Sequence, residues 1–163
     1  MRKAKSRLSR NKGLYGYLFR HCNTLPLSSS LSCMKELMEA LHTLFARGEK
    51  VLIYPEQGMW HNYKKPRPLK VGAFRFAAKE KVPVLPIFIT LEDTLAENEI
   101  GEPILAYTVH ILPVIHPDGG NNLRERSENM CQKNYELWKE TYEAFYGIKL
   151  EYTTEGKVNI CST

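Results

Sequence analysis

The stretch Lys50-Val51-Leu52-Ile53-Tyr54 decides the expected fold. It is a short, continuous apolar run bounded by Gly48 and Pro55. Runs of this kind are typical of a strand that is buried on both faces of a sheet. We therefore predict a buried strand over 50–54.

Helical patterns stand on both sides of this run. Before it, apolar residues recur at steps of three and four across 32–47, and Gly48 supplies a C-terminal stop, which predicts a helix. After it, 71–79 is expected to be a second helix and 84–91 a second buried strand. Strands that alternate with helices predict an α/β sheet whose right-handed crossovers place helices on its faces.

The second half of the chain continues the pattern. A third strand region is expected over 104–115, with Pro113 favouring an edge or a bend near its end. A long surface helix is predicted over 122–146, and Gly147 should end it. The polar tail, 151–163, is expected to be a frayed end or a weak edge strand.

The length of the chain and the distribution of its charges indicate one domain with a segment on either side. With 163 residues and 43% hydrophobic side chains, one globular domain is expected, which we place at 21–150 between the 1–20 segment and the 151–163 tail. Seven cations precede residue 21, and without them the 18 acidic residues outnumber the 16 remaining basic ones. The net charge of +5 therefore comes from the segment 1–20, which we call the basic arm, and a nucleic-acid groove is not expected.

The basic arm runs into Leu14, Tyr15, Tyr17, Leu18 and Phe19. Basic residues beside aromatics suit a peripheral contact with an anionic membrane surface. A frayed terminus whose apolar residues dock on the core is an equal alternative. The sequence shows neither a membrane span nor a signal peptide, so we expect a location in the cytoplasm, at the cytoplasmic face of the membrane.

The four cysteines form no C-x-x-C pair and no cluster with zinc-ligand spacing. We expect buried or idle thiols, no bound metal and no bound cofactor.

The stretch 54–72 is the best candidate for chemistry. Glu56 follows a predicted strand, at the end where α/β sheets form ligand crevices. It could orient a hydroxyl-bearing acceptor, and Met59, Trp60 and Tyr63 could give an acyl chain an apolar wall. The alternative is that these residues have only structural roles: Glu56 caps a turn, Trp60 packs on the core, and the basic loop is solvated. Four cations that follow could bind a phosphate: Lys64, Lys65, Arg67 and Lys70.

Three blocks of this region resemble the glycerophospholipid acyltransferase family, specifically its bacterial 1-acyl-glycerol-3-phosphate acyltransferases. Tyr54-Pro55-Glu56-Gln57-Gly58 is similar to the family's Phe-Pro-Glu-Gly-Thr-Arg block, and Val82-Pro83-Val84-Leu85-Pro86-Ile87 to its Val-Pro-Ile-Val-Pro-Val strand. Between them, Lys70-Val71-Gly72-Ala73 matches a Lys-x-Gly-Ala helix start. The resemblance spans about 14–115 and implies a mixed sheet flanked by helices.

The resemblance also assigns roles to residues. It implies that Glu56 and Gly58 belong to the acceptor site and that the basic loop binds the phosphate. Pro55 and Trp60 would shape that site, and Pro83 and Pro86 the supporting strand. Trp60 stands near the place of the family's block arginine, and residues 23–29 lack the acid and the arginine of another family block.

The family's catalytic His-x-x-x-x-Asp block is absent, because no histidine of this chain is followed by an aspartate five residues later. In the family, the histidine deprotonates the acceptor hydroxyl, and the aspartate orients the imidazole ring of that histidine. His61 is a poor replacement, since no aspartate stands near it in sequence. The resemblance therefore implies an inactive, N-terminally shortened acyltransferase or a natural relative without the dyad.

The expected function is transfer of a fatty acyl group from acyl-CoA or acyl carrier protein to lysophosphatidic acid, which makes phosphatidic acid in phospholipid biosynthesis. The alternative is a non-catalytic membrane-surface or phosphate-binding module. No residue of this chain is assigned as the general base.

Overall fold

The structure, a computed structural model, describes residues 25, 31–56, 63–152 and 161–162, and of 161–162 only the backbone. The predicted 1–20 segment lies outside them, as do residues 153–160 of the predicted tail. The chain divides into two units, Met1–Val51 and Leu52–Thr163, and each is described by itself.

The first unit contains helix α2, Leu31–Ala46, which confirms the helix expected over 32–47. Leu37 and Leu41, one turn apart, are its buried residues. Gly48 follows in the left-handed conformation with a φ of 73°, and its N–H donates to the carbonyl of Phe45. The predicted glycine stop is confirmed.

The strand predicted over 50–54 is wrong. These residues form no strand, and Leu52 and Tyr54 are 70% and 76% exposed. A strand requires a partner for its backbone N–H and C=O groups, and no strand of the described residues pairs with this run. Apolar composition alone therefore does not make it a strand.

The second unit contains a β-hairpin. Strand β2, Ile87–Glu97, pairs antiparallel with β3, Pro103–Ile111. This corrects the expected crossover, because the five residues between the strands are too few for one. The side chain of Asn98 organises the turn by accepting hydrogen bonds from the N–H groups of Ile100 and Glu102.

A second pair of strands is very short. Strand β1, Leu69–Lys70, pairs in parallel with β4, Cys161–Ser162, which confirms a weak strand in the predicted tail. The α/β composition is confirmed, but the strands of the described residues form two two-stranded sheets instead of one mixed sheet.

Helices α3, Val71–Glu80, and α4, Leu123–Tyr146, confirm the two remaining helix predictions. Asn122 caps α4 by accepting from the N–H of Glu125 at 2.9 Å, and Gly147 ends it in the left-handed conformation. The expectation of a surface helix is only half right. One face of α4 is buried and contributes Met130, Cys131, Tyr135, Trp138 and Tyr142 to the core.

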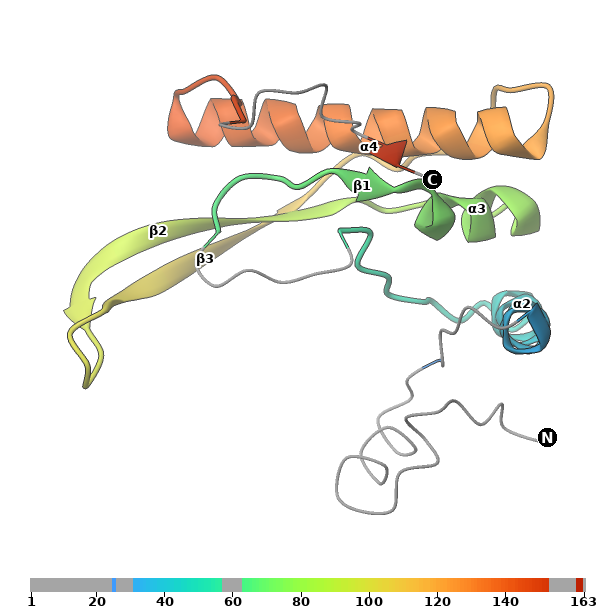
Figure 1. Cartoon of the computed structure of the whole chain (residues 1–163), viewed down its shortest axis with the longest axis horizontal. Helices are drawn as coiled ribbons and strands as arrows, with labels where there is room; N and C mark the ends of the chain where they lie inside the picture. Colours follow the sequence, from blue (N-terminus) through green and yellow to red (C-terminus); the bar gives the residue numbers. More distant parts are fainter. Residues whose placement is uncertain (1–24, 26–30, 57–62, 153–160, 163) are drawn as a thin grey trace, which may run out of the picture. The chain divides into compact units, whose positions relative to one another are not determined.

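Helix α4 runs along the hairpin, whose far end curves away from the helix (Figure 1). The rings of Phe88 on β2 and Trp138 on α4 are 5.5 Å apart. Phe88 is 6% exposed, whereas its neighbour Ile89 is 47% exposed. The expectation that this strand is buried on both faces is therefore wrong, because within this unit only the side facing α4 is covered.

The cysteine expectation is corrected at one position. Cys131 is fully buried and disulfide-bonded, whereas Cys33 is a half-buried thiol.

Candidate functional site around Glu56

Two hydrogen bonds close the base of the loop that runs from Pro55 to Lys70. The N–H of Lys70 donates to the carbonyl of Pro55 at 2.9 Å. The N–H of Arg67 donates to Oε1 of Glu56, also at 2.9 Å. The loop therefore returns to its own start, and Glu56 is held at that point.

Burial raises the pKa of the Glu56 carboxyl above its usual value of 4.5, because desolvation disfavours the charged form. The Arg67 N–H and the positive charge of Arg67 oppose this shift. Among the described residues, no second hydrogen-bond donor reaches the carboxylate. The carboxylate lies in a partly buried setting, where hydrogen bonds are stronger than in water.

Two tyrosines brace the same loop. The Tyr152 hydroxyl donates to the carbonyl of Pro66 at 2.6 Å and lies 2.7 Å from the hydroxyl of Tyr135 on α4. Tyr135 is 4% exposed, and Pro66 is fully buried. Burial raises the pKa of Tyr152, and the neighbouring Tyr135 raises it further. Both tyrosines therefore stay protonated at neutral pH and keep their hydrogen bonds.

The contacts of the four predicted phosphate ligands lead to different partners and do not bring them to one point. Nζ of Lys64 pairs with Asp93 of β2 at 2.6 Å, and Nζ of Lys65 donates to the carbonyl of Glu151 at 2.8 Å. Arg67 bonds Glu56 through its backbone N–H and not through its guanidinium, and Lys70 lies in β1. A phosphate would have to compete with Asp93 for Lys64, and the predicted phosphate role stays a prediction.

A family comparison decides what this loop belongs to. The family described as Acyltransferase matches residues 3–90, which is more than half of the chain. The chain belongs to the acyltransferase family. Comparisons with curated proteins and with solved structures gave no match. The match contains the Glu56 loop, α3 and the start of β2, and it ends before α4 and Tyr152.

The structure places part of the motif that supported the acyltransferase resemblance. Pro55 accepts the hydrogen bond that closes the loop. Pro86 is buried, and its carbonyl accepts from the N–H of Leu112, whereas Pro83 is exposed. The predicted site residues Gly58 and Trp60 lie outside the described residues, as does His61.

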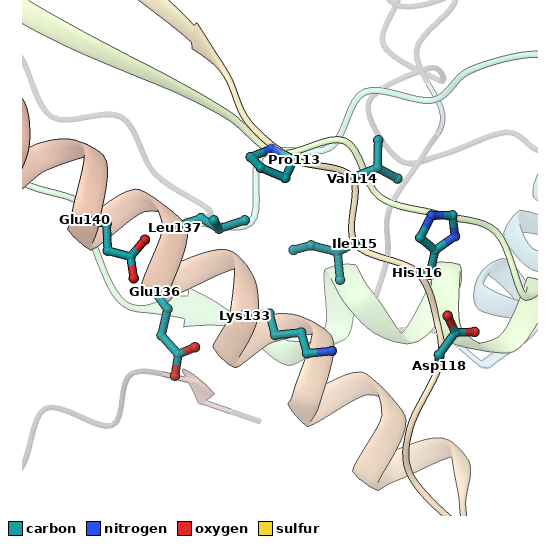
Figure 2. Close-up of a pocket in the computed structure, with 9 residues that line it drawn as sticks. All are labelled: Pro113, Val114, Ile115, His116, Asp118, Lys133, Glu136, Leu137 and Glu140. Carbon is teal, nitrogen blue, oxygen red and sulfur yellow. The ribbon is translucent and has the colours of Figure 1, made fainter.

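A pocket of about 370 Å³ lies elsewhere on this acyltransferase chain. It is bounded by the segment after β3 and by successive turns of α4, so it shares no residue with the Glu56 loop (Figure 2). Its lining combines apolar residues with charges of both signs, which gives it no single preferred ligand charge. The lining residues are Pro113, Val114, Ile115, His116, Asp118, Lys133, Glu136, Leu137 and Glu140.

Neither metal-ligand geometry nor a membrane span is found in the part of the chain that the structure describes. No three His, Cys, Asp or Glu side chains there are arranged to hold a metal ion. None of its helices combines the length and the apolar character that a transmembrane segment needs.

Sequence reasoning missed Tyr135 and Tyr152 at this site. Tyr152 reaches a residue 86 positions earlier in the chain, and no local pattern reports such a contact. For Tyr135 a signal existed, because it lies three or four residues from Cys131 and Trp138, on one helical face.

Proposed function

We propose that this acyltransferase moves a fatty acyl group from an acyl thioester, acyl-CoA or acyl carrier protein, to the free hydroxyl of 1-acyl-sn-glycerol-3-phosphate. The product would be phosphatidic acid, which serves phospholipid biosynthesis at the cytoplasmic face of the membrane. The observation that carries the proposal is the Glu56 carboxylate, held by the Arg67 N–H at 2.9 Å within a matched family region.

The proposed role of Glu56 is to bind the acceptor hydroxyl. Its carboxylate would accept a hydrogen bond from that hydroxyl and fix the direction of its attack. The hydroxyl oxygen then forms a bond to the thioester carbonyl carbon while the carbon–sulfur bond breaks. The hydroxyl proton goes to a general base, and the leaving thiolate takes up a proton.

The general base is not assigned within these 163 residues, since no His-x-x-x-x-Asp pair occurs among them. The resemblance implies that such a pair supplies the base in the family. We therefore propose that turnover requires a dyad beyond these residues, and that these residues contribute the acceptor side of the site.

The proposed phosphate ligands are the cations of the same loop. Lys64 and Lys65 hold Asp93 and the Glu151 carbonyl in the structure. The Lys64 pair is partly exposed, and such pairs are worth less than about 1 kcal/mol. A dianionic phosphate could therefore displace Asp93 at small cost.

A second candidate function is a non-catalytic module that binds a phosphate or an anionic membrane surface. The missing dyad favours it, as does the basic arm with seven cations before residue 21.

One assay separates the two candidates. Acyl transfer from labelled acyl-CoA to lysophosphatidic acid is measured with this chain and with a form extended by the upstream genomic sequence. Turnover in the extended form that Glu56→Ala abolishes supports the acyltransferase. Lysophosphatidic acid binding without turnover in either form supports the module.

A further inference from the structure

We propose that Tyr152 is a positioning residue for Glu56, which it orients through the peptide group that joins Pro66 to Arg67. The last step of this inference, from Glu56 to the acceptor hydroxyl, rests on the proposed function. The first steps rest on hydrogen bonds within the second unit.

The two residues bind opposite sides of one peptide group. The carbonyl of that group, from Pro66, accepts from the Tyr152 hydroxyl at 2.6 Å. Its N–H, from Arg67, donates to Oε1 of Glu56 at 2.9 Å. Because a peptide group is planar and rigid, fixing its carbonyl also fixes the direction of its N–H.

Three successive hydrogen bonds lead from Tyr135 to Glu56, and in each the donor points toward Glu56; we call this series the directed chain. A tyrosine hydroxyl has one proton to donate, and that of Tyr152 goes to the carbonyl of Pro66. The 2.7 Å contact between the two hydroxyls must then be a donation from Tyr135 to Tyr152. Each bond in the chain therefore polarises the next one toward Glu56.

This polarisation strengthens the hydrogen bond to Glu56. A carbonyl that accepts a hydrogen bond makes the N–H of its own peptide group a better donor, an effect of roughly 10–30% per bond. The surroundings preserve the effect, because Pro66 is fully buried and Tyr135 is 4% exposed. Tyr152 thus acts on Glu56 through the peptide group between Pro66 and Arg67.

The adjacent residues form a second tie of the same kind. Nζ of Lys65 donates to the carbonyl of Glu151 at 2.8 Å. Residues 65 and 66 are therefore bound to residues 151 and 152 in the same order. These C-terminal partners lie beyond the family match, which ends at residue 90, so the match does not assign them a role.

The test uses the whole chain with Tyr152→Phe, which removes one hydroxyl. Amide hydrogen exchange at Arg67 and NMR titration of the Glu56 carboxyl are the readouts. We expect exchange at Arg67 to rise about five- to tenfold, the equivalent of one lost hydrogen bond. The pKa of Glu56 should rise further above its usual value, because a weaker hydrogen bond from the Arg67 N–H stabilises the carboxylate less.

Tyr146→Phe is the matched control. The Tyr146 hydroxyl donates to the carbonyl of Leu91 at 2.8 Å and accepts from its N–H at 2.9 Å. This substitution also removes a tyrosine bond to a backbone carbonyl, but on β2. Unchanged readouts in Tyr152→Phe, or equal changes in both variants, overturn the proposal.

If Tyr152→Phe fails to fold, a further variant, Tyr135→Phe, tests the proposal. Tyr135→Phe removes only the first donor of the chain and leaves the bond between Tyr152 and Pro66. We expect a smaller increase of Arg67 exchange, about two- to threefold. Wild-type exchange at Arg67 in Tyr135→Phe contradicts the directed chain.

The functional step has its own readout. In the upstream-extended form, Tyr152→Phe should raise the apparent KM for lysophosphatidic acid more than that for acyl-CoA. If wild type binds no lysophosphatidic acid while the Arg67 and Glu56 readouts respond, the proposed function fails and the positioning of Glu56 by Tyr152 stands.

Discussion

Tyr152 and Glu56 hydrogen-bond to the two ends of one peptide group, the first to the Pro66 carbonyl and the second to the Arg67 N–H. The Glu56 loop belongs to the region that matches the acyltransferase family, and Tyr152 lies outside it. The Glu56 loop is therefore held in place by a part of the chain that the family match does not include.

The charge of Glu56 should lower stability at neutral pH. Its folded-state pKa is raised above 4.5 by burial, so the folded state binds more protons than the unfolded state between the two pKa values. Stability then falls as pH rises through this window. Glu56→Gln removes the charge and keeps an acceptor for the Arg67 N–H. Its free energy of unfolding relative to wild type should be higher at pH 7 than at pH 4, measured by urea unfolding.

The controls for this prediction separate charge from hydrogen bonding. Glu56→Ala leaves the Arg67 N–H without its acceptor and should cost about 1–3 kcal/mol. Glu99→Gln removes the charge of an exposed glutamate and should show no comparable pH-dependent gain. A Glu56→Gln protein whose stability relative to wild type is the same at both pH values contradicts the burial of this carboxyl.

One-sided burial of the hairpin predicts a contrast between neighbours. Phe88 is 6% exposed against Trp138, and Ile89 is 47% exposed on the other face. Phe88→Ala should destabilise the chain by about 3–5 kcal/mol, and Ile89→Ala by about 1–2 kcal/mol. Equal losses in chemical unfolding would indicate that both faces of β2 are covered.

The turn before α4 predicts a second contrast. A Cβ on Gly120 would lie 2.7 Å from the backbone N of Arg126, whereas a Cβ on Gly119 meets nothing within 4 Å. Both residues have positive φ angles, of 109° and 85°. Gly119→Ala should cost about 1–2 kcal/mol from backbone strain, and Gly120→Ala about 1–3 kcal/mol more from the clash. Thermal unfolding of the two variants measures the difference, and equal losses would contradict the close packing of Gly120.

The ion pair between Lys64 and Asp93 bears on phosphate binding. If Lys64 is a phosphate ligand, Asp93→Asn frees it and should tighten lysophosphatidic acid binding a few-fold, by about 0.2–1 kcal/mol. Lys64→Met should weaken binding. Titration calorimetry at fixed ionic strength measures both, and opposite signs are required. An unchanged affinity in Lys64→Met removes this lysine from the site.

The helices could be predicted from the sequence because their signals are local. The apolar spacing in 31–46, the Asn122 cap and the glycines at 48 and 147 each act within a few residues. The buried strand over 50–54 was wrong because burial of a strand depends on a distant partner. The hairpin was missed for a related reason, since crossover and hairpin are distinguished by the short Asn98 turn and not by apolar runs.

In the candidate site, too, local patterns predict some residues, whereas contacts between distant residues escape them. Glu56 could be found from its position in a motif, and the Lys70 N–H that meets Pro55 lies at the end of the same loop. Tyr152 could not be found, because its partner Pro66 is 86 residues away. Nor does the sequence reveal that Lys64 pairs with Asp93, since a run of cations looks the same whether it is solvated or bound.

The most direct test of the account compares two ligands at Glu56. Binding of lysophosphatidic acid and of its 2-deoxy analogue, which lacks the acceptor hydroxyl, is measured by titration calorimetry with wild type and Glu56→Gln. A hydrogen bond to a carboxylate is worth about 1.5–3 kcal/mol, against about 1 kcal/mol for a neutral one. We predict that wild type prefers the hydroxyl-bearing ligand at least tenfold and that Glu56→Gln reduces this preference several-fold. Equal preferences in the two proteins would contradict the assignment of Glu56 to the acceptor hydroxyl.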